Sequence, residues 1–193
     1  MAGLELSSPA WTAMDIGREF GFEDGVVAAD AALRLGAKPA DLDRALEVMT
    51  SWPHVTQARQ AAAVADGGAQ SIGETLTRLL VLELGIGIPE TQFAVVDRGR
   101  VAYVDLRVRR HLFEFDGKVK YLGRELGGVA DTPPEQVVWE EKRREDWLRN
   151  HDGGYGMSRV TWPELFGRAR AETKRRLARE YAESERRYGH LAE

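Results

Sequence analysis

Apolar and polar side chains alternate along residues 101–116, and this pattern predicts two β-strands joined by a tight turn. Successive side chains of a strand point to opposite faces, so Asp105 lies on the polar face of the first strand. Glu114 and Asp116 share one face of the second strand by the same alternation. If the strands pair as neighbours, Asp105 faces Glu114 and Asp116 across the ladder, at roughly 5 Å between Cβ atoms.

Three carboxylates on one face of otherwise apolar strands have two interpretations. Like charges opposite one another destabilise a sheet, so the cluster favours a bound cation, and hard oxygen ligands suit Mg²⁺ or Mn²⁺. Alternatively, the carboxylates belong to an ordinary charged outer face that Arg107, Arg109 and Arg110 balance. Both interpretations remain open at this point.

The flanking patterns predict the other elements of an α/β fold. An apolar stripe over residues 72–84 predicts a helix, and residues 92–97 predict a strand that completes a three-strand antiparallel meander. Residues 135–150 predict a helix, residues 155–162 a last strand parallel to one meander strand, and residues 163–188 a long basic helix.

The first third of the chain is rich in alanine and has a helical pattern. Apolar residues recur at helical spacing up to Leu35, and Gly36 follows as a C-cap would. A second helix begins at Pro39, and residues 57–65 predict a third. The glycine pair after Asp66 interrupts the helical pattern. We therefore predict a helical adaptor over residues 1–66, a central domain over 67–166 and a basic C-terminal helix over 167–193.

Composition and charge narrow the function classes. The chain has 193 residues, 43% of them hydrophobic, and no cysteine, which excludes a disulfide scaffold, a thiolate zinc site and a cysteine nucleophile. Residues 1–66 hold five Lys and Arg against ten Asp and Glu, so the net charge of −4 belongs to the adaptor. No run approaches the roughly 18 apolar residues of a membrane span, and no signal peptide is evident, so we expect a cytoplasmic protein without a membrane partner.

Five motifs in order along the chain resemble a known family. They surround Glu74, Asp105, the stretch Phe-Glu114-Phe-Asp116-Gly-Lys, the run Trp-Glu-Glu-Lys142-Arg-Arg, and the last predicted strand with Arg159. Their order and spacing are similar to the very-short-patch-repair-like domain of the PD-(D/E)XK endonuclease superfamily. Actinobacterial chains with this pattern often carry it behind a segment similar to AbiEi-type antitoxins. The resemblance implies a restriction-endonuclease-like core.

The resemblance also implies an activity, which is Mg²⁺- or Mn²⁺-dependent hydrolysis of DNA phosphodiesters. Asp105 and Glu114 would hold the metal, with help from Glu74. The superfamily pattern places a lysine where this chain has Asp116, so Lys118 or Lys120 would supply the amine. Three basic residues are candidates for DNA contact: Lys142, Arg143 and Arg159.

Two of these residue assignments have simpler explanations. The helix macrodipole favours a carboxylate near a helix N-terminus, which explains Glu74 without a catalytic role. The basic residues of the helix at 135–150 can belong to a solvated face paired with neighbouring glutamates. A second function class therefore stays open: a catalytically inactive nuclease-fold regulator in a toxin-antitoxin or phage-defence system. Such a regulator would bind DNA, or a partner protein through the acidic adaptor.

Overall fold

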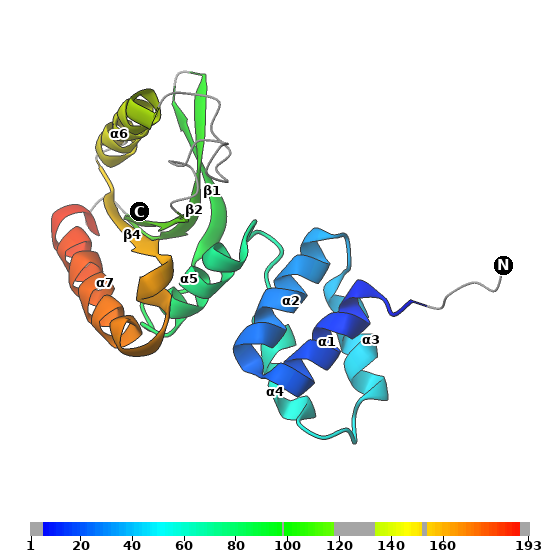
Figure 1. Ribbon diagram of the computed structural model, residues 1–193. Helices are drawn as coiled ribbons and strands as arrows, with labels where there is room; N and C mark the ends of the chain where they lie inside the picture. The colour runs from blue at the N-terminus through cyan, green and yellow to red at the C-terminus, as the bar shows by residue number, and fades with distance from the viewer. Residues whose placement is uncertain (1–5, 98, 118–133, 152–153, 190–193) are drawn as a thin grey trace. The chain divides into compact units, whose positions relative to one another are not determined.

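The computed structural model describes residues 6–97, 99–117, 134–151 and 154–189. Figure 1 shows the elements, which divide into two compact units, Met1–Leu79 and Leu80–Glu193. The division falls inside helix α5 (Ile72–Leu82), so the start of α5 belongs to the first unit. No helix of the described residues is both long enough and apolar enough to cross a membrane.

The first unit is built from helices α1 (Pro9–Phe20), α2 (Phe22–Arg34), α3 (Pro39–Val48) and α4 (Val55–Ala63). This is one helix more than the three that the sequence analysis delimits. Gly21 separates α1 from α2 because its φ of 111° lies in a region that other residues rarely adopt. The described residues of this unit contain helices and no strand, so no winged helix is present among them.

Small side chains let α1, α2 and α4 pack closely. A Cβ atom added to Gly25 would lie 2.6 Å from Cα of Gly17 and 2.9 Å from Cβ of Ala61. The helices therefore cross at positions that hold only glycine or alanine. Met14, Leu42 and Met49 are buried nearby and supply most of the bulk of this alanine-rich core.

The second unit contains a four-stranded mixed sheet with the order β1-β2-β3-β4. Strands β1 (Glu90–Asp97), β2 (Arg100–Val108) and β3 (His111–Asp116) form the antiparallel meander that the alternation predicts. Strand β4 (Gly156–Thr161) follows helix α6 (Pro134–Asn150) and pairs with β3 in parallel. The predicted α/β class and the order of its elements are confirmed.

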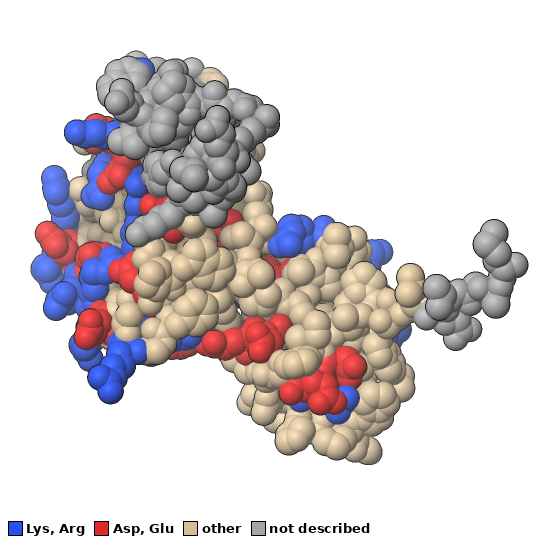
Figure 2. Space-filling view, in the orientation of Figure 1, with Lys and Arg blue, Asp and Glu red and all other residues tan. Residues whose placement is uncertain are grey.

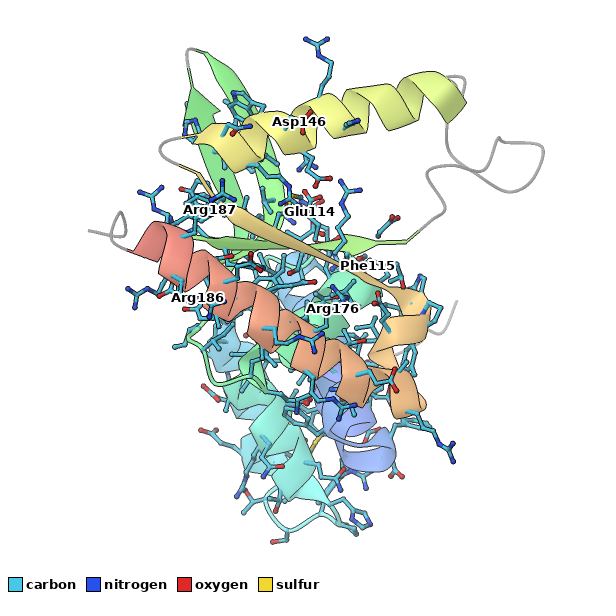
Figure 3. All side chains as sticks on the ribbon, turned by 90° about the vertical axis from the view of Figure 1, so that its left-hand side faces the viewer. Glu114, Phe115, Asp146, Arg176, Arg186 and Arg187 are labelled. Atoms are coloured by element: carbon cyan, nitrogen blue, oxygen red, sulfur yellow. The ribbon has the colours of Figure 1, made fainter. Side chains whose placement is uncertain are left out.

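Two helices pack on opposite faces of β3 and β4. Leu148 of α6 lies in one apolar cluster with Leu112 of β3 and Met157 of β4. His111 and Ser158, whose side chains point to the other face, contact α7 (Gly167–Tyr188). Figure 3 shows α6 above the sheet and α7 below it.

The C-terminal helix begins four residues later than the sequence analysis predicts. Residues Trp162–Leu165 form a 3₁₀-helix, in which Glu164 accepts a hydrogen bond from the backbone N–H of Thr161 at 2.8 Å. Phe166 then has an extended backbone, with φ −126° and ψ 158°, and α7 starts at Gly167. The prediction of one helix over residues 163–188 is wrong at its start, because this capped turn reorients the chain.

Candidate functional site

The two central carboxylates of the predicted cluster come from adjacent strands. Leu106 pairs with Phe113, so the next position of β2, Asp105, lies beside Glu114 of β3. Regular strand pairing stops there, and the Asp105 side chain accepts a hydrogen bond from the backbone N–H of Phe115 at 2.8 Å. The structure therefore brings Asp105 to the Glu114–Phe115 peptide, as the alternation predicts.

The backbone is irregular at the same place. Thr91 pairs with Leu106 and Phe93 with Val104, but Gln92, opposite Asp105, has a positive φ of 49° and forms no regular pair. A non-glycine residue in this region is uncommon, and such residues cluster at sites where side chains must be held in a set position. The irregularity distinguishes Asp105 from the other polar residues of β2.

Glu114 is buried, with 7% of its surface exposed, and its charge is balanced from two directions. Nη1 of Arg144 on α6 lies 2.7 Å from Oε1 of Glu114, and Arg144 also donates to the backbone carbonyl of Tyr103. Arg159 of β4, beside Glu114 in the sheet, has Nε 3.8 Å from Oε2. Figure 3 shows Glu114 on the side of the sheet that α6 covers.

A further carboxylate extends this network. Glu145 forms an ion pair with Arg159 at 3.1 Å and accepts a hydrogen bond from Arg149 at 2.8 Å, so acids and bases alternate across α6, β3 and β4. The sequence analysis missed Arg144 and Glu145 as site residues. Arg144 stands four residues before the buried Leu148, and this spacing places both on one helix face. That spacing is the sequence signal that distinguishes Arg144, which faces the sheet, from the exposed Lys142 and Arg143.

The other predicted site residues have different surroundings. Asp116 lies at the end of β3 opposite Thr161 and is half-buried. Lys142 and Arg143 are exposed on α6, whereas Arg159 is half-buried beside Glu114. Lys118 and Lys120 lie outside the described residues.

Glu74 belongs to the first unit and caps helix α5. Its carboxylate accepts hydrogen bonds from the backbone N–H of Gln70 at 2.8 Å and the hydroxyl of Ser71 at 2.9 Å. The Ser71 hydroxyl in turn accepts from the backbone N–H of Glu74 at 3.2 Å. These reciprocal bonds satisfy donors at the helix start, as a capping box does, and they account for an acid at this position.

Proteins often hold Mg²⁺ through one or two carboxylates, with water and substrate oxygens completing the shell, and Asp105 and Glu114 have the ligand chemistry for such a site. Among the described ranges, no group of three or more His, Cys, Asp and Glu side chains is placed to hold a metal ion. The metal site predicted at Asp105 and Glu114 therefore stays a prediction. A cation there would compete with Arg144 for Oε1 of Glu114.

A second polar network lies on the opposite face of the sheet. Nδ1 of the buried His111 is 2.7 Å from the Ser184 hydroxyl of α7, and Nε2 is 2.8 Å from the Ser158 hydroxyl of β4. Ser158 donates to Glu180 of α7. In a neutral imidazole Nε2 donates to Ser158 and Nδ1 accepts from Ser184, whose single hydroxyl proton then cannot also reach the backbone carbonyl of Glu180 at 3.0 Å. A Cβ atom on Gly156 would lie 1.7 Å from the Ser184 Oγ, so this position requires glycine.

This network makes stability depend on pH. Burial, with a smaller effect from Arg149, lowers the pKa of His111 to about 4. The unfolded chain takes up a proton near pH 6.5 and the folded chain only near 4, so stability is complete above 6.5 and is lost as pH falls toward 4. We expect a loss of about 3 kcal/mol in the free energy of unfolding over this range.

Urea denaturation at pH values from 4 to 7 tests this expectation. The wild type and His111→Gln are compared at each pH, because other acids titrate equally in both proteins. The difference between the two free energies of unfolding should shrink as the pH falls. A constant difference would show that His111 does not carry the pH dependence.

These features define the second unit as an α/β fold with a mixed four-stranded sheet and an acid pair under α6. No protein-family model matches the chain, and no solved structure matches it. The chain is similar to the uncharacterized proteins MT2308 and Rv2248 of two Mycobacterium tuberculosis strains, with 28% identity over 100 residues in each case. The match covers 51% of this chain and 37% of each relative.

Proposed function

We propose that the second unit is a divalent-metal-dependent deoxyribonuclease of the PD-(D/E)XK type. The observation that carries this proposal is the position of Asp105 and Glu114 on adjacent strands of a three-strand meander, which helix α6 and the parallel strand β4 follow. This is the architecture that the sequence resemblance implies. The irregular backbone at Gln92, opposite Asp105, supports the same site.

In this proposal Asp105 and Glu114 hold Mg²⁺ or Mn²⁺. The bound ion supplies a polarised phosphate and a water of lowered pKa. The protein supplies the rest through positioned side chains. Arg144 and Arg159 compensate Glu114 without metal. In this proposal a guanidinium released from Glu114 would bind an oxygen of the scissile phosphate. When metal and DNA bind, Glu114 would therefore exchange its arginine contacts for a contact with the metal ion, and a released arginine would contact the phosphate.

One observation favours a second candidate function. Glu114 is already neutralised by arginines, as expected if the nuclease-like fold serves only as a framework. In that case the protein is a regulator, and the acidic helical unit binds a partner protein. The two candidates differ in whether a divalent ion can displace Arg144.

Thermal unfolding of the wild type with increasing Mg²⁺ or Mn²⁺ tests the nuclease proposal. A ligand that binds only the folded state stabilises by mass action, by about 2.7 kcal/mol at 100 times its Kd. Arg144→Gln removes the competitor for Glu114, so half-maximal stabilisation should occur at a lower metal concentration. The same preparations are assayed for cleavage of single-stranded, duplex and mismatched DNA.

If the protein is instead a regulator, we expect that metal does not raise its unfolding temperature and that it does not cleave DNA. If neither ion raises the unfolding temperature and no substrate is cut, the nuclease proposal fails. A metal shift of equal size in Glu114→Gln would also count against it, because the ion would then bind elsewhere.

A further inference from the structure

Four exposed arginines lie on one face of helix α7. With 100° between successive residues of an α-helix, they fall within about 40° of one another. They are Arg168, Arg175, Arg179 and Arg186. At a rise of about 1.5 Å per residue they span about 27 Å, and we call them the arginine stripe.

The arginines of the stripe differ from Arg170, Lys174 and Arg176 of the same helix, each of which has an ion-pair partner. Within the described part of the chain, none of the stripe's four side chains forms an ion pair or a hydrogen bond. By contrast, Lys174 binds Glu83 at 3.0 Å, and Arg176 binds Glu164 at 2.8 Å and Glu180 at 3.1 Å. The paired cations attach α7 to the rest of the unit, whereas the stripe points away from the buried Leu177.

The residues beside the stripe indicate what kind of partner it fits. They are small or acidic: Ala171, Glu172, Ala178, Ala182 and Glu183. A helix that lies on a membrane needs large apolar residues to insert, and protein interfaces usually contain a buried aromatic or aliphatic centre. The stripe has neither. A line of arginines without large apolar neighbours suits a partner whose own surface is mainly phosphate.

We propose that the arginine stripe of α7 binds the phosphate backbone of duplex DNA. Its length of about 27 Å is a little less than one turn of B-DNA, roughly 34 Å, so all four guanidinium groups can meet phosphates of one duplex segment. Figure 2 shows basic side chains interspersed with acidic ones along the left edge of the second unit. In Figure 3 the helix faces the viewer, with Arg186 near its C-terminal end.

This surface lies on a different side of the sheet from Glu114, since α6 covers the Glu114 face and α7 the His111 face. The stripe therefore does not depend on the proposed nuclease chemistry. It supplies sequence-independent affinity that holds DNA on the protein whether or not the acid pair binds metal.

Fluorescence anisotropy with a labelled duplex of about 20 base pairs, in EDTA, tests this inference at several salt concentrations. Each phosphate neutralised contributes about 0.9 to the slope of log K against log salt. Arg175→Gln/Arg179→Gln removes two contacts, so the slope should become shallower by about 1.8. At 0.1 M salt the same loss weakens binding by about 60-fold.

The matched control is Arg44→Gln/Arg59→Gln, which removes two exposed arginines from the first unit. This control should keep the wild-type slope, and circular dichroism should show that both double variants are folded. An equal loss of affinity in both double variants would show that only the net charge of the protein matters, and this would overturn the proposal. So would an unchanged slope in the stripe variant, or equally tight binding of polyglutamate by the wild type. Because EDTA removes divalent metal, failure of the nuclease proposal leaves this result unaffected.

Discussion

Asp30→Ala is expected to lower the free energy of unfolding of the first unit by about 3–5 kcal/mol. Asp30 is completely buried on α2, and its carboxylate accepts Nη2 of the buried Arg78 at 2.8 Å. It also accepts the backbone N–H of Asp66 and the hydroxyl of Thr75. Removing the carboxylate leaves a buried guanidinium and two further donors without their acceptor.

The size of this effect does not mean that the ion pair itself is strongly stabilising. Burial raises the pKa of Asp30, and the opposing attraction of Arg78 only partly offsets this. For Asp30 the cost of burial thus exceeds the attraction of Arg78, and buried pairs are commonly weak net stabilisers. The energy lies in breaking the network, so Asp30→Ala combined with Arg78→Met should be less destabilised than the sum of the two single variants.

Urea denaturation followed by circular dichroism measures these differences. Asp15→Ala is the matched control, because Asp15 pairs with Arg18 at 2.8 Å but is 43% exposed, and its loss should cost less than about 1 kcal/mol. Similar losses for Asp15→Ala and Asp30→Ala would contradict the interpretation that burial sets the cost.

The acid pair was predictable because strand alternation has a period of exactly two residues. The two strands were expected to pair as neighbours within residues 101–116, and parity along each strand then put Asp105 and Glu114 on the same side. The parallel pairing of β4 was predictable from the crossover helix before it. These inferences depend only on the order and spacing of neighbouring residues, which folding does not change.

Other features depend on information that a local pattern does not contain. The partner of Asp30 is 48 residues away, and nothing near either residue indicates that they meet. Arg144 was passed over in favour of Lys142 and Arg143 because three consecutive bases look alike until the buried Leu148 fixes the rotation of α6. The capped turn at Thr161 was hidden because Pro163 and Glu164 also suit the first turn of an α-helix.

Asp105→Asn and Glu114→Gln are each expected to lower Mn²⁺-supported DNA cleavage by at least ~10²-fold, on the scale of losing a major charge-stabilising group. Both replacements keep the shape of the side chain and remove the charge that a metal ion requires. Both should also abolish the stabilisation of the folded protein by metal. Glu114→Gln leaves Arg144 with a weaker partner, so activities must be compared at a temperature where each variant is fully folded.

Glu185→Gln is the control for these two variants. Glu185 is a partly buried carboxylate of the same unit that pairs with Arg109 at 3.2 Å, on a different helix from Arg144. Its neutralisation should leave cleavage within about twofold of wild type. If Asp105→Asn and Glu114→Gln cut DNA as well as Glu185→Gln does, the acid pair has no part in catalysis. The arginines around Glu114 would then serve to compensate a buried charge in a regulatory fold.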